Sequence, residues 1–333
     1  MPYVELHVCS AFSFLRGGSL PEQLAEVAAE LELPAMALLD RNGVYGAQRF
    51  SVAAEEQKVR PIIGAELTME DGGLLPVLVA SRLGYANLCS LLTQTHLRSS
   101  VKGECTVKWE ELPEFAHGLV ALLGSASNNI PGSARVSRAA ASPARTFDVS
   151  SKQSFERPRK RDAFANTRDA CATRSPENIA QSLIEAFGRE NVYVEVQRHF
   201  LRGEDRVNRA LIDLASKFRL AVVATNGVQY AKPYGRQVLD VFTCIREHTH
   251  LDLAGRVLSR NAERHLKSDG EMRAIFRDLP DAITNTERLA DRLQFCLENI
   301  GYEFPEYLVP DGHTMSDGPL SAPSSPPETP QPI

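Results

Sequence analysis

The chain has 333 residues, of which 43% are hydrophobic and 24% are charged, and its formal net charge is -5. This length fits one large domain or two modest ones, and the hydrophobic fraction is too high for a chain that is disordered throughout. The slight acidic excess argues against a surface that is basic everywhere, as a nonspecific nucleic-acid or anionic-membrane coat would be.

Six cysteines lie far apart in the sequence, without a Cys-x-x-Cys pair, so they indicate neither a zinc ribbon nor a disulfide framework. The first ten residues lack a basic segment followed by an apolar run. No stretch reaches the roughly 18 apolar residues of a membrane-spanning helix. We therefore expect a cytoplasmic protein with free thiols and no membrane partner.

Residues 1–125 alternate strand and helix patterns. The segment at residues 19–22 has the pattern of a capping box, and the run at residues 34–39 (PAMALL) is apolar throughout, as in a strand buried on both faces. The expected strands are residues 3–8, 34–39, 61–64, 75–79 and 118–123, and the expected helices are residues 20–32, 45–57 and 85–97. This alternation predicts an α/β fold with a mostly parallel sheet or barrel, of which residues 1–125 form the first part.

The alternation stops near residue 125. Between residues 131 and 175 there are ten Lys or Arg against four Asp or Glu, and the segment is rich in Ser, Ala and Pro. We predict that residues 126–175 are a disordered basic insert, with a nucleic-acid contact as the alternative.

Regular patterns return after the insert. Ser175 followed by Pro176 is typical of a helix start, and strand and helix patterns then alternate again. The last of these patterns, the apolar run at residues 220–225 (LAVVAT), predicts another buried strand. We assign residues 176–235 to the second part of the barrel and residues 236–315 to a helical extension. Residues 316–333 contain six prolines and four serines and are expected to be a disordered tail.

Polar side chains stand at the ends of the expected strands. In α/β barrels and open sheets, functional groups lie at or just beyond the carboxyl ends of the strands. Here those positions hold His7, Cys9, Asp40, Glu66 and Asn226. His nitrogen, carboxylate oxygen and thiolate sulfur are together typical of a transition-metal site, although a single His or Asp at a strand end is more often a hydrogen-bonded turn anchor.

Several segments resemble a known family. Residues 7–13 (HVCSAFS), 39–43 (LDRNG) and 63–66 (IGAE) resemble the first three motifs of the polymerase and histidinol phosphatase (PHP) domain, in the version of bacterial C-family DNA polymerases. Residues 14–17 and 244–247 are most similar to the error-prone, polymerase III alpha-like branch. The resemblance implies a distorted β/α barrel of PHP type whose strand ends hold two or three metal ions, used for phosphoester hydrolysis by a metal-bound hydroxide.

The sequence departs from this family pattern at the expected ligands. The family's His-x-His is His7-Val8-Cys9, its Asp-His is Asp40-Arg41, its late Asp-x-His is Gly227-Val228-Gln229, and Arg16 stands where many members have an acid. The candidate ligands that remain are His7, Asp40 and Glu66, with Cys9 as a substitute fourth.

Two arginines change the electrostatics of this predicted site. Arg16 and Arg41 would repel a cluster of cations, because a guanidinium cannot lose its charge in a protein. Either arginine could instead pair with Asp40 or Glu66 and turn the metal site into a salt-bridged core. We therefore expect a degraded site that binds at most one zinc or manganese ion and has no catalytic residue.

The resemblance leads to a functional expectation. The chain is expected to be the N-terminal PHP-domain fragment of an error-prone DNA polymerase III alpha-like subunit, unable to polymerise alone because the family pattern stops after Met315, before a palm domain. The expected partners are DNA and lesion-bypass or replication proteins. The alternatives are a metal-dependent phosphoesterase of the PHP family and a non-catalytic structural or interaction module.

Overall fold

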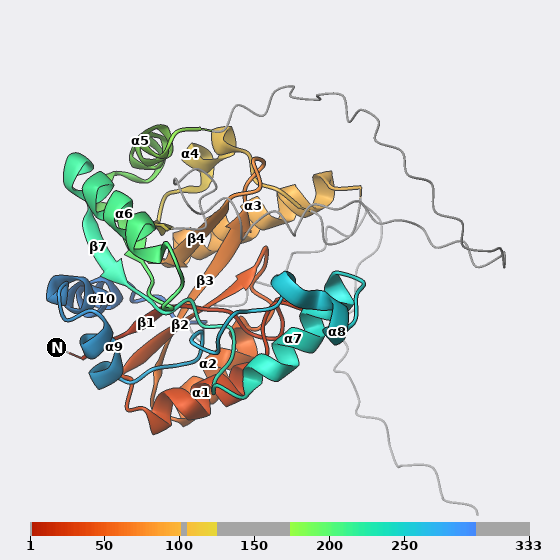
Figure 1. Ribbon diagram of the computed structural model, residues 1–333. Coiled ribbons are helices and arrows are strands. Elements are labelled where there is room, and N and C mark those ends of the chain that lie inside the picture. The colour runs from red at the N-terminus through yellow and green to blue at the C-terminus, as the bar shows by residue number, and fades with distance from the viewer. Residues whose placement is uncertain (1, 101–104, 125–173, 298–333) are drawn as a thin grey trace, which may run out of the picture. The chain divides into compact units, whose positions relative to one another are not determined.

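One seven-stranded sheet organises the protein. The structure is a computed structural model, and it describes residues 2–100, 105–124 and 174–297. Along the sheet the strands follow one another in chain order, from β1 to β7 (Figure 1). The strands are β1 (Glu5–Val8), β2 (Ala35–Arg41), β3 (Arg60–Thr68), β4 (Leu74–Val79), β5 (Leu119–Leu123), β6 (Val192–Val196) and β7 (Ala221–Ala224).

Most strand pairs are parallel, as predicted. β1, β2 and β3 pair in parallel, and so do β5, β6 and β7, whereas β4 is antiparallel to both of its neighbours. The short connection between β3 and β4 explains the exception, because a parallel crossover needs a dozen or more residues. We call the end of the sheet where the six parallel strands finish the mouth, and the opposite end the base.

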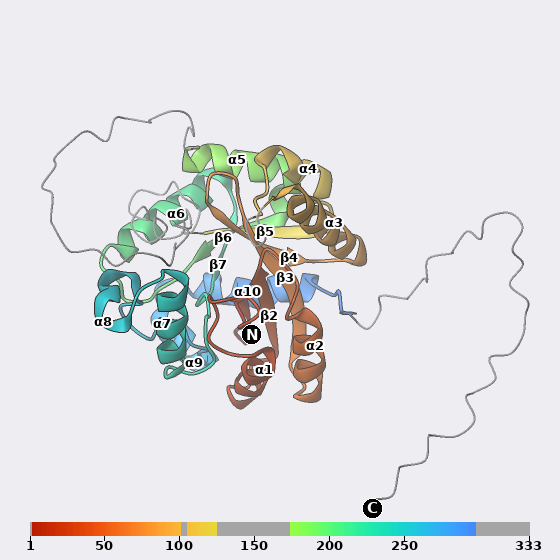
Figure 2. The ribbon, with the colours of Figure 1, turned by 90° about the vertical axis from the view of Figure 1, so that its right-hand side faces the viewer.

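The helices lie in separate groups around the sheet. They are α1 (Pro21–Glu30), α2 (Ala47–Glu56), α3 (Arg82–Arg98), α4 (Leu112–Phe115), α5 (Pro176–Phe187), α6 (Glu204–Phe218), α7 (Gly235–Arg246), α8 (Leu251–Ala254), α9 (Asp269–Ile275) and α10 (Pro280–Arg292). In Figure 2, α1 and α2 form one group and α3, α4, α5 and α6 form another. The larger apolar cluster includes side chains from both groups.

A second, smaller cluster fills the inner face of the curled sheet. Its strand residues alternate with those of the larger cluster, and α10 covers them through Leu289, Ala290 and Leu293. Residues 35–39 contribute to both clusters, so the predicted burial on both faces is confirmed there, whereas Pro34 at the start of the predicted run is exposed. α10 therefore packs against the sheet and is part of its core.

The two ends of the sheet approach each other at the mouth. Val8 at the end of β1 forms an isolated parallel bridge with Val228, which follows β7. The Cys9 amide donates to the Val228 carbonyl at 2.8 Å, and the Val228 amide donates to the His7 carbonyl at 2.8 Å. This short bridge gives an incompletely closed barrel, in agreement with the predicted α/β barrel.

Two local predictions need correction. α1 begins after Leu20, whose amide is capped by the Gln23 side chain at 3.0 Å, while the Ser19 hydroxyl accepts from the Ala231 amide at 3.0 Å. Ser19 is thus used for a tertiary contact and not for a capping box. The predicted strand at residues 220–225 is not buried throughout, because β7 is the last strand of the sheet and Ala221 is exposed.

The helix start at Ser175 is confirmed, since its hydroxyl accepts from the Asn178 amide at 3.2 Å. The predicted tail at residues 316–333 and nearly all of the predicted insert at 126–175 lie outside the described residues. The predicted domain boundaries stay predictions. Within the described ranges, no helix is both long enough and apolar enough to cross a membrane.

Candidate functional site

A buried charged layer lies at the mouth, above the inner apolar cluster. His7 occupies its centre, with Nδ1 2.7 Å from Glu195 Oε1 and Nε2 3.5 Å from Glu66 Oε1. The pairing of β1 with β2 shifts register between Glu5 and Val8. An irregularity of this kind changes the direction in which side chains leave the strand. Here it occurs beside His7, whose ring contacts Glu66 on β3 and Glu195 on β6.

Arg41 completes this layer. Its Nε and one terminal nitrogen each lie 2.7 Å from Glu66 Oε2. Arg41 and Glu66 are register partners on the adjacent strands β2 and β3, so the sheet itself holds the two side chains together. The sequence-based expectation that an arginine pairs with one of the surviving carboxylates is met at Glu66.

The acidic and basic groups of this layer keep one another in their charged forms. Burial acts to lower the pKa of His7, but the Glu195 and Glu66 carboxylates outweigh it and raise this pKa to about 10. Burial acts to raise the pKa of Glu66, yet Arg41 and His7 hold it well below its usual range. His7 holds the pKa of Glu195 down in the same way. At neutral pH the layer therefore contains two cations and two carboxylates.

Glu195 was not among the site residues predicted from the sequence. It lies on β6, where Thr225 donates a hydrogen bond to its Oε1 at 2.5 Å and Gln197 donates another at 3.1 Å. The segment at residues 192–196 (VYVEV) alternates as a strand should, and alternation places Tyr193 and Glu195 on one face. Only closure of the barrel shows that this face points toward His7.

A second buried carboxylate, Glu5, was also missed. It accepts hydrogen bonds from the Tyr3 hydroxyl at 2.6 Å, the His7 amide at 3.0 Å and the Asn226 amide at 2.9 Å. Burial raises the pKa of Glu5 to about 7, although these donors act in the opposite direction. Asn226, a predicted polar strand-end residue, thus serves as an anchor of the segment that closes the barrel.

Asp40 does not join the charged layer. Its Oδ1 accepts from the Ser10 amide and hydroxyl at 3.1 and 2.8 Å and from the Ser13 hydroxyl at 2.7 Å, while Oδ2 accepts from the Gly46 amide at 2.9 Å. These bonds fasten the loop after β1 to the loop after β2. Asp40 is therefore a turn anchor in this structure.

Cys9 is buried next to these groups. Its sulfur donates a long contact of 3.7 Å to the Ser10 carbonyl. Burial, followed by the Asp40 charge, raises the pKa of the thiol to about 12, although a hydrogen bond with Ser13 acts in the opposite direction. A metal ligand must be a thiolate, so the surroundings of Cys9 oppose the ligating form.

The other altered family positions surround the mouth. Gly227 has a φ of 53° and its carbonyl accepts from Arg264 at 3.1 Å, and the backbone of Gln229 is bonded to Arg264 and Gly18. Arg16 follows the loop that Asp40 anchors, and burial together with Arg41 and Arg246 lowers the pKa of Arg16 to about 10.

These residues do not fit a cluster of metal ions. In the three described ranges, no group of three or more His, Cys, Asp and Glu side chains is placed to hold one. Of the four predicted ligands, His7 and Glu66 lie next to each other. Asp40 and Cys9 instead form contacts with the loop that follows β1. The Arg41 guanidinium lies on Glu66 Oε2 and the His7 ring faces Oε1, so a divalent cation at Glu66 would compete with one of these two groups.

The arrangement is suited to holding the strands together. Arg41, Glu66, His7 and Glu195 come from β2, β3, β1 and β6, so one network of ion pairs connects both halves of the sheet. Removing one member would leave a buried charge without its partner. The resulting loss of folding stability is larger than the net stability that the intact ion pairs contribute.

Comparisons with known proteins agree with this architecture. The PHP domain family matches residues 5–199. The error-prone DNA polymerases of Mycolicibacterium paratuberculosis and Rhodopseudomonas palustris are each 33% identical to this chain; each alignment covers 94% of this chain and 27% of the relative. The chain therefore spans about a quarter of the length of these curated relatives.

Two solved structures show a weaker likeness. One is described as a metal-dependent phosphoesterase of Bifidobacterium adolescentis, with a TM-score of 0.42 and 12% identity over 67% of this chain and 86% of that one. The other is an amidohydrolase of Chromobacterium violaceum, with a TM-score of 0.40 and 12% identity over 68% of this chain and 87% of that one. Because the family match spans more than half of the sequence, the chain belongs to the PHP domain family.

Proposed function

We propose that this chain is the PHP module of an error-prone DNA polymerase III alpha-like protein and that it serves as a structural module without hydrolytic activity. The similarity to proteins named error-prone DNA polymerase, which extends over 94% of the chain, supports the family context. In that context the partners are DNA and proteins of replication or lesion bypass.

The contact between Arg41 and Glu66 carries the second half of this proposal. Phosphoester hydrolysis by a metal cluster requires cations that activate water and neutralise the developing charge. Here a permanently charged guanidinium occupies the carboxylate that a cation would use, with both contacts at 2.7 Å. The metal-dependent phosphoesterase is therefore the less favoured function.

The test is a phosphatase assay on the purified chain with p-nitrophenyl phosphate and added manganese or zinc. We expect no turnover above that of a heat-denatured sample. The matched control is the Arg41→His variant, which restores the Asp-His pair of the family at residues 40 and 41. Metal-dependent turnover by the unaltered chain that His7→Ala abolishes would overturn the structural role.

Metal binding is a separate prediction. We expect at most one zinc or manganese ion per chain, held by His7 and Glu66, with Asp40 and Cys9 as further candidates. Elemental analysis after dialysis against each metal measures this ratio. Two or more ions per chain would contradict a degraded site.

An exposed apolar face favours a second function, that of a protein-interaction module. Val238, Val241 and Ile245 are exposed and recur at the spacing of one helical face on α7, and the exposed Tyr234 continues this face just before the helix begins. Soluble proteins rarely leave such a stripe uncovered. Pull-down with replication proteins, comparing Val241→Asp with Leu83→Asp on α3, would show whether the α7 face binds a partner.

A further inference from the structure

The exposed aromatic side chains gather at one end of the sheet. In the described residues, the aromatic side chains among the exposed large hydrophobics are Phe14, Tyr45, Phe200 and Tyr234. Each lies in the segment that follows a parallel strand, namely β1, β2, β6 or β7. Because the carboxyl ends of parallel strands share one edge, all four belong to the mouth.

Two of these segments repeat the same four residues. Phe-Leu-Arg-Gly occurs at residues 14–17 after β1 and again at residues 200–203 after β6. Phe14 is 80% exposed and Phe200 is 70% exposed. A phenylalanine this exposed contributes little to the core, and here the same exposure recurs in both copies of one tetrapeptide.

The backbone of both loops adopts left-handed conformations that are uncommon outside glycine. Leu15 has a φ of 60° and Phe200 has a φ of 57°. Side chains other than glycine pay a steric cost in this region, and such strain is concentrated at binding sites. The first loop is also closely packed at its end, since a Cβ on Gly17 would lie 2.1 Å from the Ser10 carbonyl oxygen. Both loops thus hold their phenylalanines outward in a defined backbone geometry.

The arginine of each repeat differs from the other arginines at the mouth. Arg41 pairs with Glu66, Arg198 with Asp278, and Arg246 with Glu247. Arg16 and Arg202, by contrast, show no hydrogen bond or ion pair from their side chains within the described part of the chain. The Arg246 guanidinium donates at 2.8 Å to the Leu15 carbonyl, so it holds the Arg16 loop close to a further positive charge.

We propose that the two Phe-Leu-Arg-Gly loops form a binding platform for single-stranded nucleic acid. Phe14 and Phe200 each stack on one base, and Arg16 and Arg202 each bind a backbone phosphate. Aromatic faces combined with cationic side chains are the chemistry by which proteins bind single strands without reading their sequence. A duplex fits less well because its bases are already stacked on one another.

The platform rests on the proposed function in one respect, because only the polymerase context favours DNA over RNA as its ligand. Stacking and phosphate binding by themselves require only the loops. Failure of the structural role at the charged layer would leave the platform intact, because Phe14 and Phe200 take no part in that layer.

The experiment measures fluorescence anisotropy of labelled oligothymidylate and oligouridylate of about 20 nucleotides, long enough for one or two typical site sizes. The double variant Phe14→Ala/Phe200→Ala removes both stacking faces, and Phe14→Trp/Phe200→Trp retains them. Leu83→Ala is the matched control, since Leu83 is also exposed but lies at the start of α3 near the base. Circular dichroism of each variant confirms that it is folded.

We expect each lost stacking face to weaken binding about 5- to 150-fold, while the tryptophan variant and Leu83→Ala bind as the unaltered chain does. Arg16→Ala/Arg202→Ala should lower the slope of log affinity against log salt by about 1.4, or about 0.7 for each lost phosphate contact. Lys58→Ala, an exposed charge near the base, should leave this slope unchanged.

Three results would overturn the platform: no binding of either oligonucleotide, binding that survives loss of both phenylalanines, or tighter binding to a duplex. The absence of oligonucleotide binding is also the result expected if the mouth binds a peptide. Binding of RNA at least as tight as that of DNA, with the same loss in the alanine variants, would support the platform. That result would count against the DNA context of the proposed function alone.

Discussion

The mouth and the base of the sheet are stabilised in different ways. At the mouth, His7, Arg41, Glu66 and Glu195 bury their charges against one another beneath loops that expose Phe14 and Phe200. At the base, α10 supplies apolar side chains to the inner cluster, and Arg60 at the start of β3 donates to backbone carbonyls of that helix.

This difference predicts how each end responds to substitution. A buried charge that loses its partner cannot be rehydrated, so one change at the mouth affects every member of the network. A hydrogen bond lost at the base leaves carbonyls near the surface, which water can reach. The unpaired aromatic and cationic groups of the mouth loops lie outside both cores, and we therefore expect them to affect binding more than folding.

The largest effect is expected from Glu195→Ala. In the described residues, the substitution leaves the His7 ring with Glu66 as its remaining ion-pair partner, and it removes the acceptor used by Gln197 and Thr225. We expect the free energy of unfolding to fall by about 3 to 5 kcal/mol, the usual cost of breaking a buried ion pair. Chemical denaturation followed by circular dichroism measures this change.

Glu56→Ala is the matched control for that experiment. Glu56 is an exposed glutamate at the end of α2, where a substitution should change the free energy of unfolding by less than about 0.5 kcal/mol. Equal losses in the two variants would mean that the charged layer has no special role in stability.

A pH titration should produce the next largest effect. The folded pKa of His7 is about 10 and its ordinary value is 6.5, so the stability it contributes is complete below pH 6.5 and is lost as the pH rises toward 10. At about 1.4 kcal/mol per pH unit, we expect a fall of about 2 to 3 kcal/mol between pH 7 and pH 9. Denaturant titrations at several pH values measure it.

The same titration can separate His7 from Glu5. The folded pKa of Glu5 is about 7 and its ordinary value is 4.5, so its contribution is lost between pH 4.5 and pH 7. The variant His7→Gln removes the imidazole and should therefore lose most of the slope between pH 7 and pH 9, while a slope from Glu5 remains at lower pH. A persistent slope above pH 7 in that variant would assign the effect to another group.

Much of the fold could be predicted because its local signals agree. Apolar runs and helical spacing indicated most strands and helices, and their alternation indicated a mostly parallel sheet. The direction of β4 was missed because an apolar run carries no information about strand direction. The hydrogen bond of Ser19 was not predicted because its partner, Ala231, is distant in the sequence.

The candidate site could be predicted only in part. His7, Asp40 and Glu66 were recognised because polar residues at strand ends stand out from apolar runs. Their actual partners depend on the register between β2 and β3 and on closure of the barrel, which pairs Arg41 with Glu66 and His7 with Glu195. Such long-range geometry is absent from local sequence patterns.

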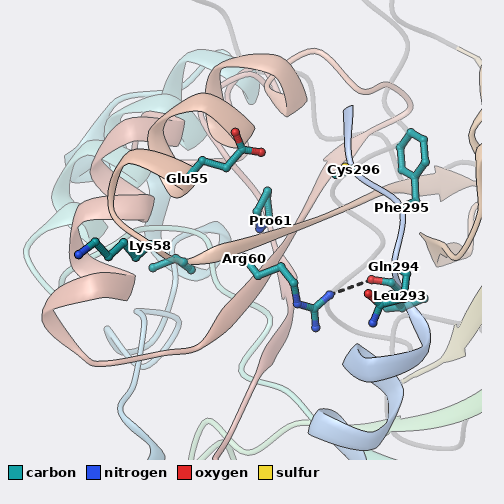
Figure 3. Close-up of a pocket in the computed structure, with 9 residues that line it drawn as sticks. Glu55, Lys58, Arg60, Pro61, Leu293, Gln294, Phe295 and Cys296 are labelled. Carbon is teal, nitrogen blue, oxygen red and sulfur yellow. Dashed lines mark hydrogen bonds between the residues drawn. The ribbon is translucent and has the colours of Figure 1, made fainter. Parts of the chain in front are cut away.

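At the base, Arg60→Ala is expected to have a moderate effect. Arg60 donates at 2.8 Å to the Leu293 carbonyl and at 2.9 Å to the Ala290 carbonyl, beside a pocket of about 470 Å³ (Figure 3). The Leu293 carbonyl follows the last turn of α10, the Ala290 carbonyl also accepts from the Leu293 amide at 3.0 Å, and the positive charge is favourable at a helix C-terminus. We expect a loss of about 1 to 2 kcal/mol in denaturant unfolding.

Lys58→Ala provides the control for that contact. Lys58 lines the same pocket but is exposed, and Figure 3 shows it turned away from Arg60. Its removal should leave the free energy of unfolding nearly unchanged. A loss as large as that of Arg60→Ala would indicate that the local positive charge matters and the two hydrogen bonds do not.

The smallest effect is expected at Ser81, which precedes α3 near the base. Its hydroxyl accepts from the Gly84 amide at 3.2 Å, one of the amides that a helix start leaves without a partner. Ser81→Ala should lower the free energy of unfolding by about 1 kcal/mol, whereas Ser81→Asp retains an acceptor and should lose much less. Thermal unfolding of the two variants measures the difference. If both lose the same amount, the effect arises from packing against Gly118 and not from the cap, because either substitution changes that contact while only alanine removes the acceptor.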